Sequence, residues 1–197
     1  MNKLLFSTID VTRQAFYRTA HAFAIVNLKP IVPGHVLVVP NRVVPRLADL
    51  SPTEVSALFT SVQLVGRIVE RAYNADGLSI ACQDGLAAGQ SVPHVHVHVL
   101  PRKLSGRPDG GDTFSEHNDA VYPALEDSEQ TLPRDLKAAQ QQLHGVDGFE
   151  TKEVKQERIN RLKVDADEAR PPRTMEDMIR EADWLRGLFV GEDQAKN

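Results

Sequence analysis

Three histidines alternate with valines at residues 94–99, His-Val-His-Val-His-Val, and this alternation constrains the fold more than any other part of the sequence. Successive side chains of a β-strand point to opposite faces, so the spacing of two predicts that His94, His96 and His98 share one face. The valines between them are β-branched and suit the buried face of a strand. We therefore expect a strand over 94–100 with one chemical face and one core face.

The rest of the first half contains the signals of a small antiparallel α+β domain. Pro33-Gly34 suits the centre of a type II turn between two apolar runs. Ser51 and Glu54 form a capping box that begins a helix with an apolar stripe. Strands are predicted at 22–28, 35–40 and 78–82, and the helix is predicted to end at Asn74-Ala-Asp-Gly77. The order β-β-α-β-β predicts the α+β class.

Composition divides the chain into three parts. We expect a core at 1–103, a polar acidic insertion at 104–173 that is largely loop or disordered, and a final helix at 174–190. That helix is expected to dock on the domain or on a partner subunit. The first 102 residues contain 9 Lys and Arg against 6 Asp and Glu, whereas the remainder contains 14 against 21. The histidine half is the basic one, which favours a small anionic ligand.

Several function classes are disfavoured by the sequence. Residues 1–102 contain no cluster of Lys and Arg that would follow a phosphate backbone, so we do not expect nucleic-acid binding. The apolar run Leu4-Leu5-Phe6 is shorter than that of a signal peptide, and no stretch approaches a membrane span. We expect a soluble protein in the cytoplasm, with the nucleus as a second compartment.

A glycine-rich segment, Asp84–Val92, precedes the histidines and suits a phosphate. Its glycines allow backbone amides to turn inward as donors, and we expect the amides of Gly89–Val92 to do so. A phosphate held there would lie beside His96, whose neutral imidazole is a competent nucleophile. Attack requires the other ring nitrogen to donate to a fixed acceptor, such as a carbonyl of the same strand. His98 would then protonate the leaving oxygen.

Two other interpretations of the histidines stay open on the residues alone: a zinc site, and a structural role in which hydroxyl or carbonyl groups bond to the imidazoles. Three histidines on one face can ligate zinc, but imidazoles spread along a strand by about 3.3 Å per residue would have to converge on one point. Asn27 and His35 interrupt the two apolar runs that flank the turn, which makes both candidates for the same site. His35 suits a structural role as well as a functional one.

The motif His94-Val-His-Val-His98, with Gly89-Gln-Ser-Val92 before it and Pro101-Arg102 after it, resembles the histidine triad superfamily. Together with 24–40 and Gln83-Asp-Gly85, it is similar to the fragile histidine triad branch of dinucleoside triphosphate hydrolases. The resemblance implies hydrolysis of diadenosine triphosphate to AMP and ADP through a nucleotidyl intermediate on His96. It also implies a homodimer with a sheet continuous across the subunits. Magnesium or manganese would enter with the substrate, and no metal site on the protein is expected.

The same resemblance implies a role for each matching residue. His96, His98 and His94 would be the catalytic set, with His35 in support. The implied substrate-binding residues are Asn27 at the ribose, Gln83 and His98 at the phosphates, and Gly89, Gln90, Ser91 and Val92 in the phosphate loop.

Two alternatives remain beside this assignment. The branch that hydrolyses nucleoside phosphoramidates shares Gly89-Gln-Ser-Val92, but usually lacks Pro-Arg after the triad. A nucleotide-binding signalling protein, whose substrate complex is the output, would need the same residues. The DNA-end-repair branch needs a zinc finger that one cysteine cannot supply, and the uridylyltransferase branch has glutamine where this chain has His98.

Overall fold

The computed structural model describes residues 3–130, 132, 134–136, 138 and 172–194, and it confirms the antiparallel α+β class. Five strands form one sheet in the order β3-β4-β5-β7-β6, and every neighbouring pair is antiparallel. A two-stranded ribbon, β1-β2, lies beside it. The strands are β1 (Leu5–Phe6), β2 (Ile9–Asp10), β3 (Ala15–Arg18), β4 (Ala22–Val26), β5 (Val36–Pro40), β6 (Gly77–Ala81) and β7 (Val97–Arg102).

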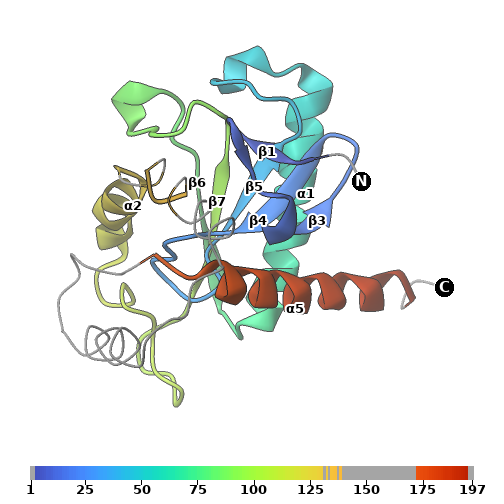
Figure 1. The fold of residues 1–197 in the computed structure, drawn as a ribbon. Helices are drawn as coiled ribbons and strands as arrows, with labels where there is room; N and C mark the ends of the chain where they lie inside the picture. The colour runs from blue at the N-terminus through green and yellow to red at the C-terminus, as the bar shows by residue number, and fades with distance from the viewer. Residues whose placement is uncertain (1–2, 131, 133, 137, 139–171, 195–197) are drawn as a thin grey trace, which may run out of the picture.

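Three helices accompany the sheet (Figure 1): α1 (Pro52–Ala72), α2 (Val121–Gln130) and α5 (Met175–Gln194). The predicted capping box starts α1, because the Ser51 hydroxyl accepts from the Glu54 amide at 3.3 Å and the Glu54 carboxylate accepts from the Ser51 amide at 2.8 Å. Helix α1 packs on β4, β5 and β7, and α5 packs on β3, β4 and α1. Short 3-10 turns occur at Thr12–Gln14, Leu47–Asp49, Leu86–Ala88 and Asn118–Ala120.

The predicted turn between β4 and β5 is present. The His35 amide donates to the Val32 carbonyl at 3.1 Å, and Gly34 has φ +81°, the left-handed value that a type II turn requires at its third residue. A Cβ on Gly34 would lie 2.5 Å from the Tyr73 ring and 2.8 Å from Pro101. Conformation and space therefore both require glycine, and the turn fixes His35 at the start of β5.

The histidine strand is shorter than predicted. Strand β7 begins at Val97, so His94 lies in the bend that precedes it and His96 immediately before its first residue. The backbone bends because the amide of His94 bonds to Val92 and that of Val95 to Val44. Alternation nevertheless holds on the core side, because Val95, Val97 and Val99 are buried in the main apolar cluster.

The acidic insertion differs from the expected loop at residues 118–130, where a 3-10 turn continues into α2. Val121 and Leu125, one helical turn apart, pack with Ile31, Leu100 and Phe114 in a second apolar cluster. Leu100 and the core valines alternate along β7, so α2 lies on the histidine face of the sheet and α1 on the other. Residues 139–171 of the expected loop lie outside the described residues. Among those described, no helix is long and apolar enough to cross a membrane.

Candidate active site

His94 is a structural clamp that uses both ring nitrogens. The Ser7 amide donates to Nδ1 at 3.0 Å, and Nε2 donates to the carbonyls of Pro40 and Arg42 at 3.0 and 3.1 Å. Burial lowers the pKa of His94 to about 4, so the ring is neutral. His94 therefore joins β1, the end of β5 and the bend before β7. The zinc site of three histidines does not form, because neither nitrogen of His94 is available to a metal.

His96 presents a reactive nitrogen with a fixed tautomer. Its Nδ1 lies 2.7 Å from the carbonyl oxygen of His94 and donates a proton to it. In the neutral ring the lone pair is therefore on Nε2, as nucleophilic attack requires. The edge of the Phe6 ring packs against the imidazole at a centroid distance of 5.2 Å. The backbone carbonyl and the apolar ring together set both the proton position and the ring direction.

His98 is held in the opposite tautomer by a chain of three side chains. The Lys29 amide donates to Asn27 Oδ1 at 3.2 Å, which turns the Asn27 amide nitrogen toward the His35 ring, 3.3 Å from Nδ1 and 3.2 Å from Nε2. The Ile31 amide donates to Nδ1 of His35 at 3.4 Å and so makes Nδ1 the acceptor. His35 must then carry its proton on Nε2, which donates to His98 Nδ1 at 2.9 Å. The remaining His98 proton is therefore on Nε2.

A nucleophile and a proton donor consequently lie side by side. The rings of His96 and His98 have centroids 5.0 Å apart, and their side chains are 1% and 0% exposed. Burial lowers the pKa of His35 to about 3, with Arg173 adding to the effect, and burial holds the pKa of His98 well below its usual range. Both rings stay neutral near pH 7, which preserves the relay. Sequence reasoning placed His35 near the site but did not reveal this connection.

The glycine-rich loop differs from the expected nest of four amides. Gly85 and Gly89 have φ +102° and +86°, but the amide of Gly89 donates to the Leu86 carbonyl and that of Gln90 to the Gly85 carbonyl. These two amides close the turn and do not face the histidines. The Gln90 side chain donates to the Pro45 carbonyl at 2.9 Å, and Val92 is buried in the core.

One side chain of this region contacts the site, and a second is a candidate for ligand binding. The Ser91 hydroxyl and the His96 ring both contact the carboxylate of Glu129. Gln83 packs against the loop, since a Cβ on Gly89 would lie 2.6 Å from its Nε2. Its Oε1 is buried without a hydrogen-bond partner among the described residues. An unsatisfied buried amide beside a glycine turn is suited to a ligand. A role of Gln83 at the phosphates stays a prediction. The Asn27 amide accepts from the Lys29 amide through Oδ1 and faces the His35 ring with Nδ2.

Glu129 of α2 is the site residue that sequence reasoning missed. Its Oε2 accepts from the Ser91 hydroxyl at 2.8 Å and lies 3.4 Å from His96 Nε2, while Oε1 lies 3.9 Å from His98 Nε2. The side chain is 1% exposed. A signal existed in the sequence: Val121, Leu125 and Glu129 share one helix face at a spacing of four, so a carboxylate continues an apolar row.

Glu129 also changes the protonation of His96. Burial lowers the pKa of His96, but the Glu129 charge, its hydrogen bond and the His94 carbonyl outweigh this effect and leave the pKa raised. Burial raises the pKa of Glu129, but the charge of His96 outweighs that effect and leaves it lowered. With α2 in this position, the Glu129 carboxylate favours the protonated form of His96, and an imidazolium has no lone pair with which to attack phosphorus.

The ligand atoms of His96, His98 and Glu129 lie within 4.8 Å of one another, a distance compatible with a metal ion. The hydrogen-bond relay opposes that use, because it leaves a proton on His98 Nε2. Magnesium prefers oxygen ligands and retains several waters, so two imidazoles and one carboxylate fit it poorly. Two imidazoles and one carboxylate match zinc or iron better than magnesium, but the proton on His98 Nε2 opposes ligation through that nitrogen.

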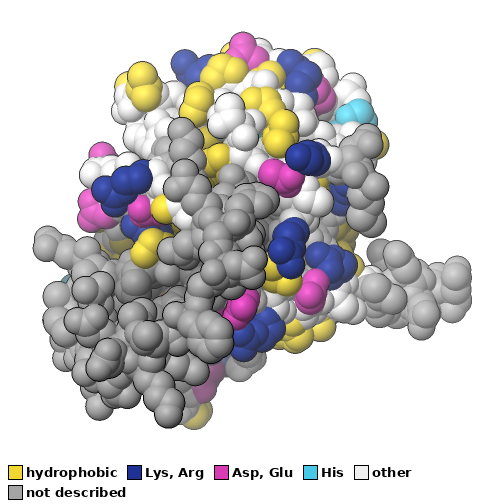
Figure 2. All heavy atoms as spheres, viewed as in Figure 1, with side chains coloured by type: hydrophobic (Ala, Val, Ile, Leu, Met, Phe, Trp, Pro, Cys, Tyr) yellow, Lys and Arg dark blue, Asp and Glu magenta, His cyan; other side chains and the backbone are white. Residues whose placement is uncertain are grey.

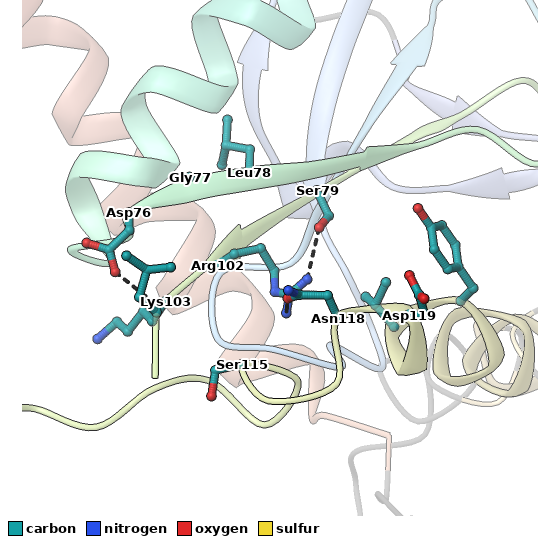
Figure 3. A pocket seen from close by; sticks show the side chains of 12 residues that line it. Asp76, Gly77, Leu78, Ser79, Arg102, Lys103, Ser115, Asn118 and Asp119 are labelled. Carbon is teal, nitrogen blue, oxygen red and sulfur yellow. Dashed lines mark hydrogen bonds between the residues drawn. The ribbon is translucent and has the colours of Figure 1, made fainter. Parts of the chain in front are cut away.

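Both signs of charge occur on the face of the molecule shown in Figure 2, where Lys and Arg side chains are interspersed with Asp and Glu. A separate pocket lies at the far end of β6 and β7, where Arg102 donates to Ser79, Asp112 and Asn118 (Figure 3). Arg102 is four residues beyond His98, about 13 Å along the strand. Its contacts show that it holds the segment after β7 against the sheet.

Comparisons with known proteins agree with this geometry. The HIT domain family model matches residues 9–104. The chain is 46% identical over 192 residues to the asymmetrical bis(5'-nucleosyl)-tetraphosphatase of Schizosaccharomyces pombe. This alignment covers 98% of the chain and 97% of the relative. It is 41% identical over 177 residues to the bifunctional bis(5'-adenosyl)-triphosphatase/adenylylsulfatase FHIT of Arabidopsis thaliana, covering 90% of this chain and 78% of the relative.

Solved structures agree at the level of the fold. The Caenorhabditis elegans NitFhit protein matches with a TM-score of 0.60 and 30% identity over 95% of this chain and 30% of that one. Plasmodium falciparum diadenosine triphosphate hydrolase matches with a TM-score of 0.51 and 28% identity over 61% of this chain and 80% of that one. With the triad geometry, the matching domain and a 46% identical relative aligned over 97% of its length, the chain belongs to the histidine triad (HIT) family.

Proposed function

We propose that this protein hydrolyses dinucleoside polyphosphates, with diadenosine triphosphate as the preferred substrate and AMP and ADP as products. The observation that carries the proposal is the pairing of a lone pair on His96 Nε2 with an N–H on His98 Nε2, each fixed by its own hydrogen-bond chain. The names of the Schizosaccharomyces pombe and Arabidopsis thaliana relatives support this substrate class. They differ in the number of phosphates, so the preference for three is the part that needs testing.

The reaction follows from the two tautomers. His96 Nε2 attacks the α-phosphorus, a nitrogen–phosphorus bond forms, and the bond to the bridging oxygen breaks. His98 gives its Nε2 proton to that oxygen, and ADP leaves. The positive charge on the nucleotidyl imidazole is stabilised by the His94 carbonyl at Nδ1. Water then attacks phosphorus, His98 takes up a water proton, and the electron pair returns to His96 as AMP leaves.

The remaining site residues are proposed to bind the substrate. Gln83 and the Ser91 hydroxyl would contact the phosphates, with Gly89 allowing the close approach of Gln83. Gln90 and Val92 would support this loop from behind. Asn27 would bind the ribose while also orienting His35. The substrate would enter with magnesium or manganese on its phosphate oxygens, because the ligand atoms of the site are poorly suited to hold either ion alone.

We also propose a homodimer through the β6 edge. Strand β6 is at the end of the sheet, so one row of its backbone groups has no strand partner among the described residues. Ile80 on β6 is 51% exposed, and Phe59 of α1 is 43% exposed. Exposed edges and apolar side chains favour association. Light scattering of Ile80→Lys tests this, since a monomer is expected from the variant and a dimer from the wild type.

The decisive experiment is intact mass spectrometry of wild type and His96→Gly after incubation with diadenosine triphosphate and magnesium. Wild type should release AMP and ADP and show a transient AMP adduct, which the variant should lack. Diadenosine tetraphosphate is assayed beside it to determine the chain length preferred. Cleavage of an adenosine phosphoramidate with neither polyphosphate hydrolysed would contradict the proposal, and so would tight nucleotide binding without turnover.

A further inference from the structure

Helix α2 covers the reactive histidines and brings an anion to them. Within Val121–Gln130, Glu129 reaches the triad with its carboxylate, which lies 2.8 Å from the Ser91 hydroxyl, 3.4 Å from His96 Nε2 and 3.9 Å from His98 Nε2. These three groups also face any phosphate that reacts with His96. We infer that Glu129 is an internal mimic of the substrate phosphate, and that α2 closes the active site until a nucleotide displaces it. The inference concerns regulation of the site and rests on the proposed function.

The carboxylate and a reacting phosphate exclude each other. A phosphorus atom in position for attack lies about 3–3.5 Å from the nucleophile. The Glu129 oxygen is 3.4 Å from His96 Nε2, on the side where the lone pair emerges. Both rings are almost completely buried, so Nε2 of His96 is not open to solvent. A nucleotide can reach it only after the Glu129 side chain, and the helix that carries it, have moved.

The same segment contacts the proposed nucleoside side of the site. Asp135, six residues after Glu129, forms an ion pair with Lys29 at 2.5 Å, two residues from Asn27. Leu132 and Leu136 are buried within the main apolar cluster. Helix α2 and the described residues after it, 132 and 134–136, therefore place one carboxylate against the triad and two leucines in the main core.

The contacts of α2 are compatible with reversible opening. Helix α2 buries two apolar side chains, Val121 and Leu125, and the described residues after it bury Leu132 and Leu136. Helix α1 alone buries five, Leu58, Val62, Val65, Ile68 and Val69. The Glu129 charge lies 3.4 Å from His96 Nε2, and the carboxylate favours the protonated form of that ring. A substrate phosphate replaces the carboxylate with an anion that makes the same contacts. Closure of α2 therefore lowers the affinity for a nucleotide but does not change the arrangement of the triad.

The test compares Glu129→Gln with Asp127→Asn, an exposed position on the same helix that undergoes the same charge change. The first measurement is carbethoxylation of His96 by diethyl pyrocarbonate, followed by peptide mass spectrometry with exposed His21 as internal reference. This reagent needs a neutral, accessible nitrogen and no nucleotide. If α2 is closed over the site in about nine molecules of ten, His96 of Glu129→Gln should be carbethoxylated about 10-fold faster than His96 of wild type. Asp127→Asn should match wild type.

The second measurement is the affinity for AMP by titration calorimetry and kcat/KM on diadenosine triphosphate. Removing the competitor should tighten AMP binding about 10-fold and raise kcat/KM by a similar factor. Leu125→Ala, which loosens α2 but keeps the carboxylate, should shift all three quantities in the same direction. It therefore tests closure even if Glu129→Gln folds poorly.

The outcomes separate the two proposals. Equal carbethoxylation of His96 in wild type, Glu129→Gln and Leu125→Ala would overturn the inference. A fall in kcat for Glu129→Gln with unchanged AMP affinity would also overturn it, because Glu129 would then take part in the chemistry. If no variant hydrolyses a dinucleoside polyphosphate or binds AMP, the proposed function fails. The carbethoxylation rates would still decide whether α2 covers His96.

Discussion

The two sides of the active site are held in different ways. On the sheet side, His94 is fixed through both ring nitrogens, His96 through Nδ1 and His98 through the relay, and most of their partners are backbone groups. On the helix side, Glu129 is held by one hydroxyl and by the charge of the ring that it faces. Backbone partners persist in any state that keeps the sheet, whereas a charge pair can be replaced by another anion. The arrangement of the histidines therefore persists as long as the sheet is folded, whereas α2 covers them only until another anion replaces the Glu129 carboxylate.

The largest effect is expected from breaking the sheet side at the nucleophile. His96→Asn removes the attacking nitrogen, and we expect kcat to fall by about 10⁴-fold or more. Chromatography of nucleotide products measures this, and circular dichroism checks that the fold is retained. AMP binding should survive, since Ser91 and Gln83 are unchanged. Turnover within a factor of ten of wild type would show that another group attacks phosphorus.

The second prediction breaks the relay without touching the substrate. His35→Leu removes the N–H that donates to His98 Nδ1. Without that donor, the proton of the His98 ring is no longer confined to Nε2 and can move to Nδ1. Loss of general acid catalysis should lower kcat on diadenosine triphosphate about 100-fold. The p-nitrophenyl ester of AMP, whose leaving group needs no proton, should be affected much less. Equal losses on both substrates would assign His35 a purely structural role.

The third prediction sharpens the comparison through pH. The closed pair raises the pKa of His96. A group whose pKa is raised in one state stabilises that state fully at pH values below its ordinary pKa. The stabilisation, here of the closed state, is lost as the pH rises through the raised pKa. Closure should therefore weaken with increasing pH. We expect Glu129→Gln to exceed wild type in kcat/KM about 10-fold near pH 6 and by progressively less toward pH 9.

The neighbours of the pair favour this assignment of the titrating group. The other polar groups facing it are the Ser91 hydroxyl from the glycine loop, the His94 carbonyl and His98, with His35 behind. The pKa values of His35 and His98 are lowered, first by burial, so neither gains a proton in this range. A ratio of variant to wild type that does not change with pH would exclude His96 as the group responsible.

The smallest effect is a control on the far side of the sheet. Ser51→Ala removes the hydroxyl that caps α1 and should lower the free energy of unfolding by about 1 kcal/mol. Urea denaturation measures the loss. The carbethoxylation rate of His96 should stay at the wild-type value, because opening of α2 is local and does not require α1 to unfold. A parallel increase in that rate would mean that His96 is exposed by global unfolding.

Local patterns in the sequence predicted a large part of the fold. The capping box at Ser51, the turn at Gly34 and the alternating valines all depend on neighbours close in the chain, and all are present. The start of β7 was predicted three residues too early, because the bend at His94 is imposed by Ser7, Pro40 and Arg42 from distant segments. Short strands β1, β2 and β3 carried too few residues to show a period.

The sequence by itself determined the family, the antiparallel class and the identity of His96 as the candidate nucleophile, since each depends on residue type and spacing. Only the tertiary structure decided which ring nitrogens carry protons, which loop amides are already used, and that an acidic helix reaches the triad. Glu129 and His96 are 33 residues apart in the sequence. No local pattern encodes such a distance, because hydrogen-bond partners and buried charge pairs are set by how the elements pack.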